Sequence, residues 1–329
     1  MTYSSGSLIV ATDYNGFVST TAGANVNATW NTTYGQPALA TVAATNTVTA
    51  TSWASLVNTL SALGTHTNTA ITARTAPVAG NTISILSALN TDITNVYTNR
   101  FNAYAVGTQF TGWTGTNSKT TQTGTSGGAA WTITFTNTVT WASAAAAGYF
   151  FDAGGRVQIQ VGKTSTGLTG DPAWNDLAGT LCGTINITKG AGVTQTIAGV
   201  AYTGTTKTGG TGTPTTLATT TGWDSLVAAA AATIVYKQFS ATAPYTTDFI
   251  QHSIAKNVTG TTLTITTLWS ANDTNVPPVG GTDPITGGTA VTAGTFGTAP
   301  ATLVTYFPPE STNLTTASWG TPTVAATTV

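Results

Sequence analysis

The feature that most constrains this sequence is a run in which apolar residues alternate with polar ones, chiefly threonine. The run is WTITFTNTV, residues 131–139, and a period of two is typical of a strand that buries one face. Threonine is β-branched and stiff at its first side-chain torsion, so it suits the solvent face of such a strand. We therefore expect strands here and in the stretches 183–188, 233–239, 261–268 and 301–307.

Gly/Thr-rich connectors and short helical segments separate these strands. We expect short helices at about residues 141–148, 171–177 and 223–231. Strands that alternate with turns and short helices predict a mainly β fold, which we interpret as an antiparallel β-sandwich with short helices at its corners. The sandwich is expected to form a Thr-rich domain over residues 106–329.

The first hundred residues follow helical spacing instead. Apolar residues recur three and four apart over 53–63, with Gly64 as the expected stop, and further helices are expected over 12–18 and 84–100. Such helices bury little surface alone, so we predict a helical assembly and attachment segment over residues 1–105, whose apolar faces pack on neighbouring chains or on the sandwich. The candidate assembly residues are Tyr14, Phe17, Trp53, Leu56, Leu60 and Leu63.

The stretch YFFDAGGRVQIQV, residues 149–161, has the pattern of a β-hairpin. Two glycines near an aspartate, followed by an alternating strand, are a typical hairpin signal. We expect Asp152 to cap the turn, Gly154 and Gly155 to let the chain turn tightly, and Arg156 to remain free for a contact.

The composition is far from that of an average globular protein. Only 6% of the residues are charged, against about 25% in typical domains, and threonine makes up roughly a quarter of the chain. A formal net charge of −1 does little to keep copies apart, so the chain fits an ordered assembly outside the cytoplasm. An ordinary secreted β-protein is the alternative. Nine basic residues spread singly do not form the basic patch of a nucleic-acid binder.

Neither a membrane span nor an export signal is expected. No apolar run approaches the length of a membrane span, and the N-terminal sequence MTYSSGSLIVATDYNG lacks the basic leader of a signal peptide. A surface that looks extracellular without an export signal suits a particle made in a host cytoplasm and released by lysis.

Two stretches contain parts of known catalytic motifs. Gly162-Lys163-Thr164 matches the last three residues of the phosphate-loop motif. That motif needs a second glycine five residues before Gly162, where this chain has Val157. Asp171 and Asp176 are a close carboxylate pair, yet five residues apart on a short helix they point in different directions. We therefore predict no catalytic residues and no enzyme activity.

The sequence also lacks the residue patterns of a metal or cofactor site. His66 and His252 lie far apart without cysteine partners, so no ligand spacing is present. The segment 272–275, Asn-Asp-Thr-Asn, could hold calcium but is more typical of a turn. Cys182 is expected to be a buried small apolar residue. We predict neither a metal nor a cofactor.

Tryptophan side chains offer two alternatives. They could form a stacking platform for sugars, or they could be core anchors of separate strands and helices, which is the interpretation we favour. The residues concerned are Trp113, Trp131, Trp141, Trp174, Trp223, Trp269 and Trp319.

Several segments together resemble a known family. They are Ile9–Asn15, Asn46–Trp53 with His66 downstream, Asn99–Asn102, and, most specifically, Tyr149–Val157. These segments are similar to virion structural proteins of tailed bacteriophages, known best from phages of marine cyanobacteria. That family carries a tyrosine, two phenylalanines, Asn, a small residue, two glycines and a basic residue, with Asp152 replacing the Asn here. The resemblance covers about residues 8–190.

The resemblance implies a non-enzymatic structural component of a virion. We expect it in the tail, baseplate or fibre as a symmetric homo-oligomer, with a trimer favoured, in contact with other virion proteins. One alternative is a capsid decoration or neck/collar protein. An alternative of another class is a carbohydrate-binding adhesion module that recognises host surface glycan through exposed tryptophans.

Overall fold

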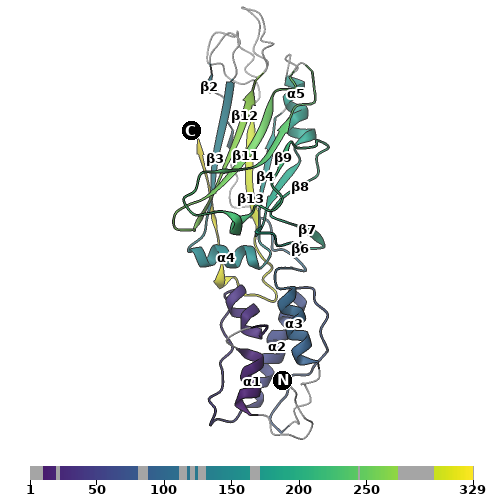
Figure 1. Ribbon diagram of the computed structural model, residues 1–329, viewed down its shortest axis with the longest axis vertical. Coiled ribbons are helices and arrows are strands. Elements are labelled where there is room, and N and C mark those ends of the chain that lie inside the picture. The colour runs from purple at the N-terminus through teal and green to yellow at the C-terminus, as the bar shows by residue number, and fades with distance from the viewer. Residues whose placement is uncertain are drawn as a thin grey trace, which may run out of the picture.

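The computed structural model is elongated, with helices at one end and β-sheets at the other (Figure 1). The C-terminal segment runs down from the sheets to the helices and back up (Figure 1). The residues that the structure describes are 10–19, 23–80, 88–110, 117–118, 123–124, 131–163, 171–243, 245–272 and 300–328.

The helical part contains α1 (Ala11–Val18), the π-helix η1 (Ala28–Thr33), α2 (Ala50–His66) and α3 (Leu89–Thr98). Thr49 caps α2, because its side chain accepts a hydrogen bond from the Ser52 N–H. Gly64 does not end α2, which continues to His66. The described part of the third expected helix begins at Leu89, and residues 81–87 lie outside the described ranges.

The six candidate assembly residues pack within the chain, which corrects the expectation that they face neighbouring chains. None of Tyr14, Phe17, Trp53, Leu56, Leu60 and Leu63 is more than 8% exposed. The Tyr14 ring meets the Trp53 ring edge-on at a centroid distance of 5.3 Å. The sequence argument failed because α1, η1, α2 and α3 bury these side chains against one another.

Two antiparallel sheets and one small hairpin make up the β part of the described chain, so the mainly β sandwich with a helical N-terminal segment is confirmed. The first sheet has the order β1 (Asn117–Ser118), β13 (Ala301–Phe307), β4 (Arg156–Gly162), β5 (Thr184–Ile187) and β8 (Thr205–Thr208). The second has the order β14 (Thr323–Thr328), β3 (Trp131–Thr140), β12 (Thr262–Ala271), β11 (Phe249–Lys256), β10 (Thr233–Phe239) and β9 (Thr216–Leu217), with β2 (Thr123–Gly124) also beside β3. The hairpin is β6 (Gln195–Ile197) with β7 (Val200–Tyr202).

Alternation along β3 sorts its residues between core and surface. Ile133, Phe135 and Val139 are buried, while the threonines between them are partly exposed. On the neighbouring strand β12, Leu263, Ile265 and Trp269 are buried in the same way. Their apolar side chains fill the space between the sheets, as in other sandwiches. The core extends without a break into the helical part.

Short helices lie at the corners of the sandwich: α4 (Ala144–Asp152), α5 (Asp171–Asn175) followed by the π-helix η2 (Asp176–Leu181), and the 3-10 turns η3 (Trp223–Ser225) and η4 (Thr316–Ser318). The helix expected over 223–231 is wrong beyond its first turn. The backbone is extended at Leu226, and Ala228 forms a bridge with Lys256.

The hairpin expected over 149–161 is also wrong, because its first half is helical. Residues 149–152 end α4, which starts in an alanine run after Ser143, and alanine has the highest helix propensity. Ser143 accepts a hydrogen bond from the Ala146 N–H and caps the helix. The two glycines therefore join a helix to β4 rather than two strands.

Buried polar contacts fasten the helical part to the sandwich. His66 at the end of α2 donates through Nδ1 to Glu310 Oε1 at 2.8 Å. Gln36 donates to the Ser318 hydroxyl at 2.9 Å and accepts from the Thr315 N–H at 2.9 Å. Glu310, Thr315 and Ser318 all belong to the segment between β13 and β14. The two parts therefore form one body.

Candidate functional site

Three segments that are distant in the sequence place a lysine between two aspartates. Lys189 follows β5, Asp152 ends α4, and Asp224 lies in η3. The Lys189 ammonium donates to Asp152 Oδ1 and to Asp224 Oδ2. Lys189 is only 8% exposed, and lysine is almost never so buried unless it is paired. We call Lys189, Asp152 and Asp224 the lysine cluster.

Aromatic residues accompany the three charged residues of the lysine cluster. Each aspartate follows an aromatic residue, in Phe151-Asp152 and Trp223-Asp224. The Phe151 and Trp223 rings stack with centroids 5.3 Å apart and an interplanar angle of 17°. The Phe101 ring lies 4.4 Å from Lys189 Nζ. The Lys189 ammonium therefore lies against an aromatic ring, which weakens solvent screening and strengthens its ion pairs.

Close backbone contacts fix the lysine and one aspartate relative to each other. The Asp224 N–H donates to the Lys189 carbonyl at 2.8 Å. A side chain at Gly222 would place its Cβ 2.3 Å from the Thr188 carbonyl oxygen, and one at Gly190 would place it 2.4 Å from the Gly222 nitrogen. Only glycine fits at both positions, so the two segments approach as closely as backbones can.

Replacing Gly222 with alanine is expected to destabilise the fold by about 2–3 kcal/mol, because the added methyl overlaps a backbone oxygen that cannot move alone. Urea denaturation of the variant measures this loss. Gly192→Ala is the matched control for an added methyl, since nothing lies within 4 Å of a Cβ there, although its positive φ of 78° adds a cost of about 1 kcal/mol. Equal losses in both variants would contradict the close approach at Gly222.

Gln195 ties the lysine cluster to the helical part. Its side-chain amide donates to the Phe101 carbonyl at 3.0 Å and to the Phe151 carbonyl at 2.9 Å. Its side-chain oxygen accepts from the Lys189 N–H at 3.0 Å. One fully buried glutamine thereby connects the chain leaving α3, the end of α4 and the lysine, and each of its bonds satisfies a backbone group.

Burial changes the acid–base behaviour of the cluster. Burial raises the pKa of Asp152 from 3.8 to about 6, although the Lys189 ammonium opposes this rise. Burial alone would lower the pKa of Lys189, but the Asp152 and Asp224 carboxylates outweigh it and raise that pKa. Asp152 is therefore protonated more readily than a solvent-exposed aspartate, while Lys189 stays protonated at rest.

The structure gives the residues singled out near Asp152 different roles from those expected. Asp152 does not cap a hairpin turn but binds Lys189. Gly154 has a φ of +90°, and a Cβ at Gly155 would lie 2.6 Å from the Phe150 carbonyl oxygen, so both glycines allow tight packing. Arg156 is not free, because its guanidinium lies 4.3 Å from the Phe307 ring centroid.

Sequence reasoning missed Lys189, Asp224 and Gln195. Lys189 is separated from Asp152 by 37 positions and from Asp224 by 35, so no local motif contains them. The repeated aromatic–aspartate pair, at 151–152 and 223–224, is the one signal in the sequence that could have linked the two carboxylates.

The remaining candidate residues lie apart from the lysine cluster. Cys182 is buried as expected, and burial raises the pKa of its thiol to about 12. His252 is buried beside Thr267, and burial lowers its pKa to about 3. His66 binds Glu310. The expected turn over 272–275 lies mostly outside the described residues, as does the side chain of Asp171.

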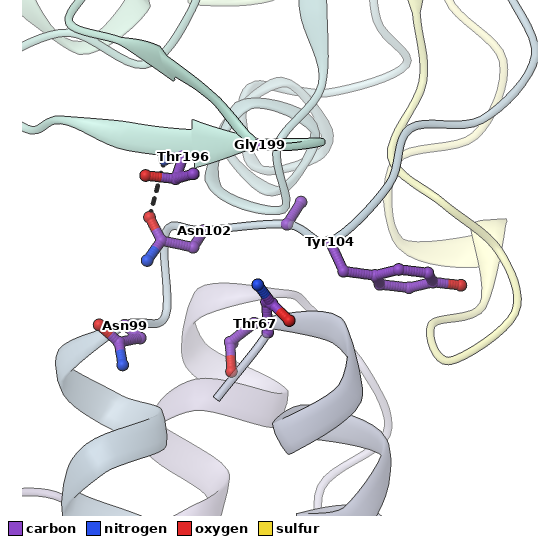
Figure 2. A pocket seen from close by; sticks show the side chains of 8 residues that line it. Thr67, Asn99, Asn102, Tyr104, Thr196 and Gly199 are labelled. Atoms are coloured by element: carbon purple, nitrogen blue, oxygen red, sulfur yellow. Dashed lines mark hydrogen bonds between the residues drawn. The ribbon is translucent and has the colours of Figure 1, made fainter. Parts of the chain in front are cut away.

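A small polar cavity lies where the ends of α2 and α3 meet the β6–β7 hairpin. Its volume is about 200 Å³. Asn102 closes one side, since its side-chain oxygen accepts from the Thr196 N–H at 2.8 Å, and the Tyr104 ring points away toward the C-terminal segment (Figure 2). Uncharged residues line the cavity: Thr67, Asn68, Asn99, Asn102, Ala103, Tyr104, Thr196 and Gly199.

In the part of the chain that the structure describes, no helix is both long and apolar enough to cross a bilayer. Within the same ranges, no three His, Cys, Asp or Glu side chains come together in a group that could hold a metal ion.

Comparison with known proteins adds no relative. No protein-family model, no curated protein and no solved structure matches this chain.

Proposed function

We propose that the chain is a non-enzymatic structural component of a tailed-bacteriophage virion, built into the tail, baseplate or fibre as a symmetric homo-oligomer, with three copies favoured. The observation that carries the proposal is the junction between the two parts. A continuous core and the buried His66–Glu310 and Gln36–Thr315 contacts make an elongated, stiff body. A stiff body with a nearly uncharged, hydroxyl-rich surface suits a part with fixed neighbours.

The burial of tryptophan supports scaffolding over glycan binding. Trp30 is partly buried, and its indole N–H donates to the Pro37 carbonyl at 2.9 Å. Trp113 and the side chain of Trp131 lie outside the described residues. Stacking on sugars needs an exposed ring face, whereas six tryptophans are no more than 3% exposed: Trp53, Trp141, Trp174, Trp223, Trp269 and Trp319.

Strand β14 supports association with a neighbouring copy of the chain. It pairs with β3 along one side and lies at the end of its sheet. Its sequence TVAATT has neither charge nor proline, the usual devices that protect an edge strand from pairing with another chain. The edge strand β8, by contrast, is short and carries Lys207. We place the contact between copies at β14, because the apolar faces of the helices are already used.

Ala325→Lys is expected to weaken self-association about tenfold, because a lysine on an edge strand opposes pairing with a neighbouring strand. Ala325 is exposed, so the fold should not change. Analytical ultracentrifugation of the full chain over a range of concentrations measures the effect. Thr266→Lys, on the central strand β12, is the matched control and should leave association unchanged. If the wild-type chain stays monomeric, the proposal that β14 forms a contact between copies is wrong.

The proposal is tested by asking whether the chain is part of a particle. Particles from a lysate are purified on a density gradient, washed in high salt and analysed by quantitative peptide mass spectrometry. We expect this chain at a fixed ratio to the other virion proteins, and its loss into the wash would count against a structural role. A capsid decoration or collar protein would also be found at a fixed ratio to the other virion proteins. It would differ only in its location on the particle.

The adhesion alternative rests on a different observation, the uncharged cavity beside Asn102 and Thr196. Amide and hydroxyl groups of this kind are able to bind the hydroxyls of a neutral sugar. Binding of the full chain to a host-surface glycan array, lost in Asn102→Ala, would favour that function.

A further inference from the structure

We propose that Lys189 and Asp152 become joined by a covalent isopeptide bond, with Asp224 as the base that takes up and relays the protons. The inference does not depend on the virion role. It starts from an arrangement that a simple ion pair does not need: one buried amine directed at two carboxylates that come from separate elements. A nucleophile, an electrophilic carboxyl group and a base within hydrogen-bond reach are the parts of an acyl-transfer site.

The two aspartates differ in the way that their roles require. The Asp152 side chain is 18% exposed and that of Asp224 is 32% exposed, so Asp152 is the more protected from water. Burial raises the pKa of Asp152 to about 6, which supplies the neutral carboxylic acid that an amine attacks more readily than a carboxylate. Asp224, nearer to solvent, serves as the base.

The placement of the reacting groups and the exclusion of water from the Lys189 amine favour the reaction. The Lys189 amine is held by hydrogen bonds to both Asp152 and Asp224. Its attack on a carboxyl group therefore needs no diffusive encounter. The close backbone contact between residues 188–190 and 222–224 fixes two of the three groups. The Phe101 ring covers the amine and limits access of water, which would otherwise favour the separate acid and amine.

The step balances in atoms and charge. The Asp224 carboxylate takes a proton from the Lys189 ammonium, and the neutral amine attacks Cγ of the protonated Asp152. The new C–N bond forms a tetrahedral carbon, from which a hydroxyl leaves with a proton as water, while the amide nitrogen keeps one hydrogen. Asp224 relays these protons and ends neutral. No oxidant or other reactant is required.

Intact-mass spectrometry of the full chain, purified and then denatured, tests the bond. The loss of one water lowers the mass by about 18 Da relative to the sequence, and denaturation does not reverse it. Lys189→Arg keeps the positive charge but lacks the nucleophilic amine, so it should have its full sequence mass, as should Asp152→Ala. A wild-type chain with its full sequence mass would overturn the proposal, whatever the variants do.

Digestion with trypsin locates the bond. Trypsin does not cleave after a lysine whose amine is acylated, so residues 120–156 should be recovered joined to residues 164–207. A joint between Lys189 and Asp224 instead would overturn the assignment of Asp152 as the acceptor. Asp224→Asn should slow the mass loss at least about a hundredfold while circular dichroism remains that of the folded chain. Bond formation at the wild-type rate in this variant would overturn the role of Asp224.

Discussion

Trp269→Ala is expected to lower the free energy of unfolding by about 3–5 kcal/mol, the range for removing a large aromatic side chain from a packed core. Trp269 is fully buried near the C-terminal end of β12. Its ring stacks on Trp174 of α5 with centroids 5.6 Å apart, so the substitution empties a space that neighbouring side chains cannot fill. Urea denaturation followed by circular dichroism measures the loss.

Thr264→Ala is the matched control for this substitution. Thr264 lies on the same strand but on its partly exposed face, where the change should stay within about 0.5 kcal/mol. A similar loss in both variants would mean that the inner face of β12 does not form the core.

Glu310→Ala is expected to cost about 3 kcal/mol, because it removes one partner of a buried pair. Glu310 accepts from His66 Nδ1 at 2.8 Å and from the Thr312 N–H at 2.7 Å, so the substitution leaves both donors without a partner in the junction. Glu310→Gln, which keeps an acceptor oxygen, should lose about 1 kcal/mol. If the Ala variant is as stable as the wild type, Glu310 does not stabilise the junction between the helical part and the sandwich.

The His66–Glu310 pair also predicts how the stability of the fold changes with pH. Burial raises the pKa of Glu310, but hydrogen bonds from His66, Asn313 and Thr312 outweigh it and lower the pKa from its usual 4.5. A lowered folded-state pKa means that the contribution is fully present above about pH 4.5 and is lost as the pH falls through the folded value. The stability difference between the wild type and Glu310→Gln should therefore shrink only at acid pH.

Clean periodicity is what made parts of the fold predictable. β3 and β12 alternate between apolar residues and threonine, and β13 was found in the same way. β11 was missed, because Gln251, His252 and Ser253 interrupt its apolar pattern; His252 is accommodated by its hydrogen bond to Thr267. β14, made of threonine, alanine and one valine, shows too little contrast between its faces.

Local preference was misleading where tertiary contacts decide. Alanines after Trp223 favour a helix, yet the chain extends there to bridge Lys256. Asp152, Gly154 and Gly155 were recognised as special from their neighbours in sequence, but what Asp152 binds depends on how distant segments fold together. Lys189 and Asp224 come from such segments, so local reasoning had no access to the lysine cluster.

Immunogold electron microscopy of purified phage particles, with antibody against residues 106–329, tests the central claim most directly. The account predicts label at the tail tip, baseplate or fibres. Label over the head or collar would keep a virion role but replace the appendage with decoration or neck architecture. Particles that carry the gene but bind no antibody at any position would contradict the claim that this chain is a structural part of the virion.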